Sequence, residues 1–426
     1  MLPNLAGGFK PGRAVASSPP LACPTLTATR LNFAIFWVGQ FVSRFGDSMF
    51  HIGLVWLALE LTGSKAAMGL ISMAGYLPAL LFGLYAGAIA DRVDRRRLMM
   101  GADVLQALAV ASIPALHALG ALSGWHLAAA AFVLATGASL FGPARDSFVP
   151  VVADQSRLLR ANSFLHLSGH LAWVLGPAAA GLVIAWVGTV HLFTVDSLTF
   201  VVSLATLALL RLPRGAAKAP VDPERPSATA AALEGVRHVW ADGRLRMLLL
   251  LTAADNLVIM GPAVVGTPIF VQEALGGGPA DYAVQMACLF GGMATGALLI
   301  GRFGEHLPKG RMLLLGIVLD GLTFLPFALC HDLVSMGALL FVHGLTVPLL
   351  VSARPAIIQE NVPDALRGRV FSLVDLTVVG STAVSCGLTG MAADVVSMRT
   401  IYVAIGLAGA LLGALGFLHR ALRETR

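Results

Sequence analysis

Long apolar runs separated by short polar breaks dominate the sequence. A membrane-spanning helix needs about 20 mostly apolar residues to cross a hydrocarbon layer of roughly 30 Å. Open strands would leave backbone groups unpaired in lipid, so these runs indicate helices. The pattern predicts twelve spans, at approximately 31–59, 66–90, 97–120, 126–150, 161–187, 190–212, 245–273, 279–303, 310–330, 333–357, 368–393 and 400–419.

The longest polar interval, 213–244, divides these spans into six plus six. It is rich in proline and ends in a helix-compatible run from Ser227 to Trp240. The predicted organisation is a disordered cytoplasmic tail (1–30), an N-terminal six-helix bundle (31–212), a cytoplasmic linker with a short helix (213–244), a C-terminal six-helix bundle (245–419) and a cytoplasmic C-terminal tail (420–426).

The two halves of the chain match at three places with nearly equal offsets. The matching positions are Asp47 with Asp255, Arg92 with Arg302, and Pro143-Ala144 with Pro355-Ala356. Duplicated halves of six spans are typical of transporters in which one half rocks against the other around a central site. The repeat therefore predicts two pseudo-symmetric six-helix bundles in an all-α membrane protein.

Composition and charge support this architecture. Hydrophobic residues make up 57% of the chain and charged residues 12%, too few to cover the surface of a soluble protein of 426 residues. The basic residues gather in the tails and after every second span, while the loops on the other side hold only Lys65 and Arg399. This asymmetry places both termini in the cytoplasm and explains the net charge of +6 without nucleic acid as a partner.

Signatures of enzymes and cofactor sites are missing from the sequence. It contains no GxxxxGK[ST], GxSxG or HExxH motif, and its four cysteines form no CxxC pair. His166 and His170 are four residues apart, but no further metal ligand accompanies them. We therefore expect no cofactor, no metal and no enzymatic activity.

The most specific motif lies between the second and third spans. It runs from Gly87 through Asp91-Arg92-Val93-Asp94 to Arg95, Arg96 and Arg97. Gly83 and Gly87, four residues apart, would allow the second span to approach a neighbouring helix closely. Asp91 would accept hydrogen bonds from an adjacent helix N-terminus or pair with the arginines.

This segment resembles the signature loop of the major facilitator superfamily. The stretch from Gly75-Tyr76-Leu77-Pro78 to Asp103, the Gly39-Gln40 to Asp47 region and the Gly368-Arg369-Val370-Phe371-Ser372 segment are similar to its macrolide-efflux branch, which also resembles exporters of enterobactin-type siderophores. The resemblance covers nearly the whole chain. It implies twelve helices in two bundles and transport of the drug:proton antiporter type.

The resemblance also assigns roles in the signature loop. It implies that Asp91 engages backbone amides near Arg367 to Arg369 when the transporter faces outward, and that Arg92, Arg95 and Arg96 pair with Asp146 or Asp103. In the second half Gly301 stands where Asp91 stands in the first, so a second such lock would be weaker or absent. The alternative is that the loop only anchors the chain at the cytoplasmic face.

A second motif, Gly176-Pro177-Ala178-Ala179-Ala180-Gly181, resembles the proline-glycine antiporter motif of drug exporters. It departs from that pattern by one residue before the final glycine. Pro177 lacks a backbone donor and would bend the fifth span. The alternative is a proline that the membrane helix simply tolerates.

Four charged residues lie near the middle of predicted spans: Arg44, Asp47, Asp255 and Asp320. A charge at this depth costs several kcal/mol and usually faces a cavity or a partner. We predict that these residues form the path of the proton or substrate, with Arg44 and Asp47 paired on one helix face. A static Arg44–Asp47 ion pair, and polar packing contacts for Asp255 and Asp320, are the alternatives.

Other polar residues are expected to have structural roles. Asp103, Asp146 and Asp375 fall nearer the cytoplasmic face and Asp196 nearer the outer face, where structural pairing is favoured. His51, one turn beyond Asp47, would share its proton or pack as a neutral histidine.

Together these features predict a proton-driven secondary exporter of hydrophobic small molecules. The resemblance places it in a bacterial inner membrane, as a monomer with the lipid bilayer, the substrate and protons as its partners. The alternatives are a metabolite importer of the same fold and, less favoured, a membrane-embedded enzyme or receptor. The sequence does not name the substrate, because a hydrophobic cavity is defined more by shape than by motif.

Overall fold

The computed structural model describes residues 26–90, 92–212, 228–304 and 307–425. Every regular element within these ranges is helical, and eleven helical segments are long and apolar enough to cross a membrane. A further long helix, α1 (Leu26–Thr62), carries Arg44 and Asp47 among its apolar residues. The prediction of an all-α fold with twelve spanning helices is therefore confirmed.

The first six spans pack together as one bundle. α1 lies against α6 and α7, and α4 lies against α5 and α7. The remaining elements of this bundle are α2 (Lys65–Ala74), α3 (Leu77–Ala90), α4 (Arg95–Ala118), α5 (Gly124–Val152), η1 (Gln155–Arg157), α6 (Leu158–Val187) and α7 (His191–Leu209).

The last six spans form the second bundle. Here α11 lies against α13, α12 against α13 and α15, and α14 against α9. The elements are α9 (Gly243–Gly261), η2 (Pro262–Gly266), α10 (Thr267–Leu275), α11 (Pro279–Phe303), α12 (Lys309–Leu322), η4 (Pro326–Leu329), α13 (Leu333–Asn361), α14 (Asp364–Val395), α15 (Met398–Gly416) and the short α16 (Arg420–Arg423).

Prolines divide two spans that the apolar pattern predicts as single runs. The second span breaks at Gly75 and Tyr76 between α2 and α3, where Pro78 lacks the N–H that would continue the helix. The seventh span contains the π-helical segment η2, which begins at Pro262 and is followed by Pro268. Both interruptions lie close to the contact between the two bundles, so they bend the helices that line it.

Side-chain caps and a left-handed glycine fix several helix ends. Asp94 accepts a 3.0 Å hydrogen bond from the backbone N–H of Arg97 and starts α4, and Asp332 accepts one of 2.8 Å from Ser335 and starts α13. Gly276, with φ 66°, ends α10.

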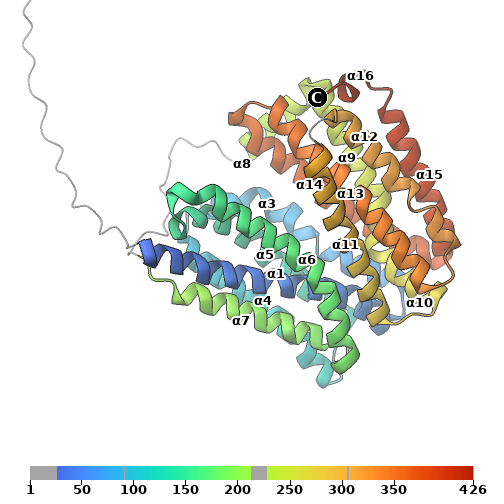
Figure 1. Cartoon of the computed structure of the whole chain (residues 1–426). Coiled ribbons are helices and arrows are strands. Elements are labelled where there is room, and N and C mark those ends of the chain that lie inside the picture. The colour runs from blue at the N-terminus through green and yellow to red at the C-terminus, as the bar shows by residue number, and fades with distance from the viewer. Residues whose placement is uncertain (1–25, 91, 213–227, 305–306, 426) are drawn as a thin grey trace, which may run out of the picture.

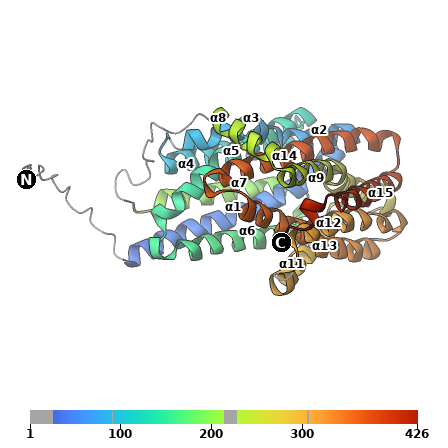
Figure 2. The same cartoon turned by 90° about the horizontal axis from the view of Figure 1, so that it is seen from above.

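The two bundles form a V. In Figure 1 they meet near α10 and diverge toward the end that holds the start of α1 and, on the other bundle, α8 (Ala228–Ala241) and α16. The turned view in Figure 2 shows α14 beside α9 and next to the N-terminal bundle. Contacts between the bundles are made mainly by α2 with α14 and by α6 with α11. We call the diverging end, which carries Arg92 and Arg95–Arg97, the basic end and the other the opposite end.

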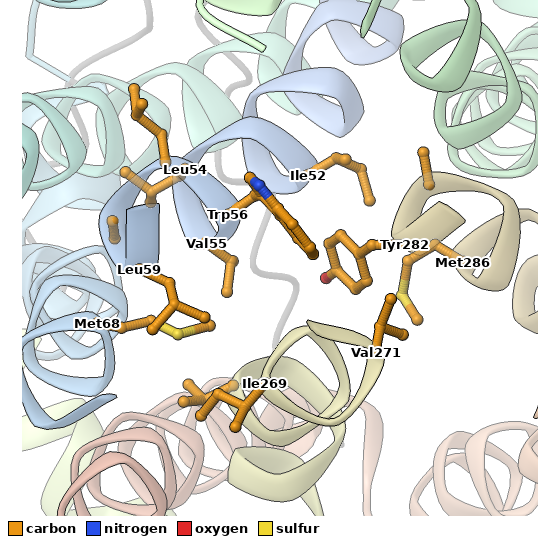
Figure 3. Packing of buried hydrophobic residues seen from close by; sticks show 14 of the residues in the cluster. Ile52, Leu54, Val55, Trp56, Leu59, Met68, Ile269, Val271, Tyr282 and Met286 are labelled. Carbon is orange, nitrogen blue, oxygen red and sulfur yellow. The ribbon is translucent and has the colours of Figure 1, made fainter. Parts of the chain in front are cut away.

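An apolar cluster joins the bundles toward the opposite end (Figure 3). The Trp56 ring of α1 stacks on the Tyr282 ring of α11, with ring centroids 6.1 Å apart, and Val271 and Met286 lie beside it. The backbones also touch: a Cβ atom on Gly69 of α2 would lie 2.9 Å from the Cα atom of Gly390 of α14. Close backbone approach of this kind is how membrane helices gain packing contacts.

Candidate functional site

A cavity of about 380 Å³ lies around the middle of α1, lined by the N-terminal bundle and by Val264 of the C-terminal bundle. α1 provides its polar wall, with Arg44, Asp47 and His51, while Tyr76 and Trp173 add aromatic surface. Most of the other lining side chains are alanine, leucine, valine or phenylalanine. The cavity is therefore mainly apolar, with a few polar groups on one side, which is the usual character of a small-molecule site.

Two further cavities share lining residues with this one and extend toward the basic end. The first, about 190 Å³, shares Arg44 and Trp173 and reaches Arg145 and Asp146. The second, about 550 Å³, shares Ala79, Ala138 and Ser139 with the central cavity, and it lies between α3, α5, α8 and α14. The three cavities therefore adjoin one another between the centre of the molecule and the basic end.

The opposite end is closed by polar as well as apolar contacts. The Lys65 Nζ atom of α2 lies 2.8 Å from Glu273 Oε1 of α10 and donates a 3.0 Å hydrogen bond to the Ala393 carbonyl of α14. Gly181 of α6 also faces α11, because a Cβ atom on this glycine would lie 3.5 Å from the Cβ atom of Ala283. The structure is thus open at the basic end and closed at the opposite end.

Asp47 lies in a cluster of charges contributed by four helices. It interacts electrostatically with Arg44 and Arg145, and Asp103 of α4 and Asp196 of α7 are also close enough to interact with it. Arg44 and Asp47 line the same cavity, yet they form no direct ion pair. The predicted direct pairing of Arg44 with Asp47 is therefore absent from this structure, although the two charges interact across the cavity that they share.

Asp103 and Asp196 are members of this cluster that sequence reasoning treated as structural. Asp103 is buried and forms no ion pair with any residue that the structure describes. Asp196 is fully buried and accepts a 3.3 Å hydrogen bond from the Thr199 hydroxyl. In the sequence, the sign of such a role was an aspartate within an apolar run. The position of Asp103 or Asp196 along its own helix does not reveal that α4 and α7 direct these side chains toward α1.

A second polar cluster lies inside the C-terminal bundle. Asp255 of α9 is 4% exposed and Asp320 of α12 is 5% exposed, and neither lines the three cavities. The Nε2 atom of His343 lies 3.7 Å from Asp320 Oδ1, and its Nδ1 atom is 2.7 Å from the Thr323 hydroxyl. The rings of Phe324 and His343 are 4.9 Å apart between centroids, so this cluster is enclosed by aromatic side chains.

His343 and Arg354 are the two residues of this cluster that sequence reasoning missed. Arg354 interacts electrostatically with Asp255, Asp320 and Asp375. The sequence did contain a sign of the role of Arg354. It lies directly beside Pro355-Ala356, and Arg145 lies directly beside the matching Pro143-Ala144 in the first half. Among the described residues no group of three His, Cys, Asp or Glu side chains is arranged to bind a metal ion.

The signature loop differs from its predicted contacts. Arg95 donates a 2.9 Å hydrogen bond to the Ser147 carbonyl, and Arg96 donates to the carbonyls of Leu207 and Ala208, both at 2.8 Å. The pairing of these arginines with Asp146 or Asp103, which the resemblance implies for the outward-facing state, is not formed here, because backbone carbonyls of α5 and α7 are their partners. Asp146 instead pairs with Arg145 at 2.7 Å.

The other parts of this loop face open space or lie outside the described residues. Arg92 is exposed, and a Cβ atom on Gly87 would meet nothing within 4 Å, so the predicted close helix approach at Gly87 does not occur here. Asp91 is one of the residues that the structure does not describe. The start of α14, near Arg367 to Arg369, is where Asp91 is expected to bind. In this structure Arg369 pairs with Glu234 of α8, and Arg367 pairs with Asp364.

The antiporter-like motif brings α6 close to two helices. A Cβ atom on Gly176 would lie 1.6 Å from the Ser48 hydroxyl of α1, while Gly181 faces α11 in the other bundle. Pro177 is buried between them, and α6 continues through it without interruption. The motif therefore lies where the cavity-lining helix meets both its own bundle and the partner bundle.

Comparison with known proteins identifies relatives along nearly the whole chain. Residues 25–426 match the family described as transmembrane secretion effector. The multidrug efflux pump Tap of Mycolicibacterium fortuitum is 30% identical over 89% of this chain and 93% of that protein. Macrolide efflux protein A of Streptococcus pyogenes is 24% identical over 93% of this chain and 97% of that protein.

Solved structures support the fold alone, because their sequences are distant. A POT family transporter in complex with a thioalcohol-conjugated peptide has a TM-score of 0.73 at 14% identity, and it covers 92% of this chain and 96% of its own. A bacterial homologue of the lysosomal transporter Spinster, in an inward-facing and unoccupied conformation, has a TM-score of 0.67 at 13% identity, with 94% and 97% covered.

Proposed function

Because the chain belongs to the transmembrane secretion effector family of the major facilitator superfamily, we propose that it exports hydrophobic, drug-like small molecules by alternating access coupled to protons. The relatives named for macrolide and multidrug efflux support this assignment. The observation that carries it is the central cavity, which is mainly apolar, is lined by Asp47 and Arg44, and shares lining residues with two further cavities on the side of the basic end.

The proposed orientation places the basic end in the cytoplasm of a bacterial cell. Arg92 and Arg95–Arg97 gather there, and Lys65 and Arg399 are the basic residues of the opposite loops. Both the start of α1 and α16 lie at the basic end, so both termini would be cytoplasmic. In this orientation the cavity is open to the cytoplasm, where an exporter collects its substrate. The transporter would work as a monomer.

Charge balance supports protons as the coupling ion. Around α1, Asp47, Asp103, Asp146 and Asp196 accompany only two arginines, Arg44 and Arg145. An unbalanced charge at this depth costs several kcal/mol, so a proton or a cationic substrate would offset the excess. A carboxylate binds protons with different affinity when its surroundings change, so Asp47 would exchange its proton as the cavity opens to alternate sides.

The C-terminal cluster would provide the second part of the same path. Asp255, Asp320 and Asp375 share Arg354, so their acidic groups also exceed the neighbouring guanidinium charge. In the present state Asp255 and Asp320 are buried away from the cavity. We propose that closure of the basic end brings this cluster into contact with the transport path.

The signature loop would act as the switch at the basic end. Arg95 and Arg96 bind backbone carbonyls of α5 and α7, so the loop moves with the N-terminal bundle. Gly87 lines the space between α3 and α14, the gap that must shut when the basic end closes. Asp91 and Arg92 would then engage the start of α14. Gly176 and Pro177 would keep α6 packed on α1 during the movement, while the contact of Gly181 with α11 would separate as the opposite end opens.

An efflux assay tests this proposal. A bacterial strain that lacks its own pumps would express the protein, and accumulation of a fluorescent lipophilic cation would be followed with and without a protonophore. Expression should lower accumulation, the protonophore should abolish this effect, and Asp47→Asn should reduce export at least about tenfold. Export that continues undiminished with the protonophore would refute proton coupling.

A matched variant tests whether the effect of Asp47→Asn comes from its place in the cavity or only from the loss of one negative charge. Asp394→Asn removes an exposed carboxylate near the opposite end of α14, away from the cavities. It should export like the unaltered protein and be present in the membrane at the same level as Asp47→Asn. Equal loss of export in both variants would remove the specific role of Asp47.

A further inference from the structure

A separate cavity of about 320 Å³ lies at the basic end, between the start of α1 and the start of α6. Its charged lining residues are Arg30 of α1, Arg157 and Arg160 near the start of α6, and Asp154. None of the three arginines forms an ion pair with a residue in the part of the chain that the structure describes. The arginines are also exposed, so an external ligand can reach them.

The single acid in this cavity leaves most of the positive charge uncompensated. The Ser156 hydroxyl and backbone N–H both donate to Asp154 Oδ1, at 2.8 and 3.0 Å. These hydrogen bonds, followed by the charges of Arg157 and Arg30, hold the pKa of Asp154 below its usual value. Asp154 is therefore ionised at neutral pH, and the cavity keeps a formal charge of +2 from three arginines and one aspartate.

An apolar strip continues from this cavity along α6. Arg160, Phe164, Leu167 and Leu171 follow one another at helical spacings of three and four residues, so they share one face. Phe164 is 43% exposed, Leu167 66% and Leu171 45%, and the Arg160 guanidinium lies 5.6 Å from the centre of the Phe164 ring.

This strip faces away from the transport cavities. His166, His170 and Trp173 of the same helix line the transport side. At about 100° per residue in an α-helix, the face with Phe164 and Leu171 lies roughly opposite to them. A molecule bound along the strip would therefore lie on the lipid-facing surface and not in the transport path.

We propose that the three arginines and this strip form a binding site for an anionic phospholipid. Guanidinium groups bind phosphate oxygens through paired, charge-assisted hydrogen bonds. Basic pockets between membrane helices at the headgroup level are typical of such lipids. The phosphate would bind among Arg30, Arg157 and Arg160, and an acyl chain would cover Phe164, Leu167 and Leu171. A free phosphate shares the headgroup chemistry but would leave the apolar strip uncovered.

Lipid competition followed by native mass spectrometry tests this site. The purified full-length protein would be equilibrated with equal amounts of phosphatidylglycerol and phosphatidylcholine in detergent, and the retained lipids counted. The unaltered protein should retain phosphatidylglycerol preferentially. Arg157→Gln with Arg160→Gln should reduce that retention at least about tenfold, because two of the three guanidinium groups that would bind the phosphate are lost.

Matched variants distinguish the site from general charge effects. Arg302→Gln removes an arginine that also lies over an aromatic ring at the basic end, 5.7 Å from the Phe303 centroid, but outside this cavity. It should retain phosphatidylglycerol like the unaltered protein. Leu167→Gln with Leu171→Gln should weaken lipid retention while leaving the arginines in place. Arg157→Lys with Arg160→Lys keeps the charge and should retain more lipid than the glutamine pair, even if the latter folds poorly.

Three results would overturn the proposal. They are equal retention of both lipids by the unaltered protein, undiminished phosphatidylglycerol retention in the arginine variant, and complete displacement of the lipid by millimolar inorganic phosphate. The last result would identify a free-anion site. None of these readouts depends on export activity, so the lipid site and the proposed transport function can fail independently.

Discussion

The two bundles place an aspartate at matching positions but surround it differently. Asp47 of α1 lines an open cavity together with His51, whereas Asp255 of α9 is buried and belongs to the cluster of Asp320, His343 and Arg354. Each half also provides an arginine beside the matching proline-alanine pair, Arg145 or Arg354. The repeat therefore preserves the types of charge, while helix packing determines which cluster reaches the cavity in this state.

Accessibility measurements should reveal the largest difference between the halves. In a variant without the four native cysteines, Asp47→Cys should react with a small water-soluble thiol reagent at least about tenfold faster than Asp255→Cys. A buried position reacts only after local opening, and each 1.4 kcal/mol of opening free energy slows the reaction about tenfold. The rates would be measured on purified protein by mass spectrometry.

Equal labelling rates of Asp47→Cys and Asp255→Cys would contradict this prediction. Equal rates would mean that the C-terminal cluster is as open to water as the central cavity, and the contrast between the halves would disappear. A rate for Asp255→Cys that rises when substrate is added would instead support its proposed exposure during the transport cycle.

Glycine contacts should also separate the two halves, in their effect on the free energy of unfolding. A Cβ atom on Gly261 would lie 2.2 Å from the Ser385 carbonyl oxygen, which is backbone. One on Gly176 would instead meet the Ser48 side chain, at 1.6 Å from its hydroxyl, which can rotate, and 2.8 Å from its Cβ atom, which must shift slightly. We expect Gly261→Ala to lower the free energy of unfolding by about 3 kcal/mol and Gly176→Ala by about 1 kcal/mol. Denaturant unfolding in detergent would measure both.

A second substitution tests whether the Ser48 hydroxyl causes the loss of stability in Gly176→Ala. Combining Gly176→Ala with Ser48→Ala removes the clashing hydroxyl and should recover part of the lost stability. A loss at Gly176 as large as that at Gly261, without recovery in the double variant, would show that the α1–α6 contact is as rigid as the α9–α14 contact.

His343 in the C-terminal bundle and His51 in the N-terminal bundle allow the same substitution to be compared in a buried cluster and in a cavity. His343→Leu would leave Asp320 and the Thr323 hydroxyl without their buried partner, so we expect a loss of about 2 kcal/mol in unfolding free energy. His51 is exposed to the cavity, so His51→Leu should change stability by no more than about 0.5 kcal/mol. Thermal unfolding of the two variants would test this, and the reverse order of effects would contradict the assignment of the buried cluster.

Much of this architecture was predictable from the sequence. The apolar runs predicted the helices, and the long interval predicted the helical segment before Trp240, which the structure places at Ala228–Ala241. The midspan charges also predicted that Arg44 and Asp47 share one side of α1. Each of these features depends on local pattern along a single helix.

The contacts between helices were not predictable in the same way. Arg96 binds carbonyls of α7 more than 100 residues away, and Asp196 turns toward α1, because helix rotation and crossing determine these partners. An arginine in a sequence also does not reveal whether a carboxylate or a backbone carbonyl will be its nearest acceptor in space. The conformational state adds a further unknown, since Gly87 faces open space in this structure, whose basic end is open.

The smallest expected effect concerns the ion pair that joins the two halves at the opposite end. Lys65 contacts both Glu273 and the Ala393 carbonyl, but Glu273 is half exposed, so the pair should contribute no more than about 1 kcal/mol. Lys65→Gln should therefore increase opening at this end only a few-fold, measured as thiol labelling of the buried Cys386 of α14 in a variant without the other three cysteines. The exchange Lys65→Glu with Glu273→Lys should restore part of the closure, although its new lysine cannot reach Ala393 in the same way. A much larger effect of Lys65→Gln would mean that this ion pair, and not the apolar contact of Trp56 with Tyr282, holds the two bundles together.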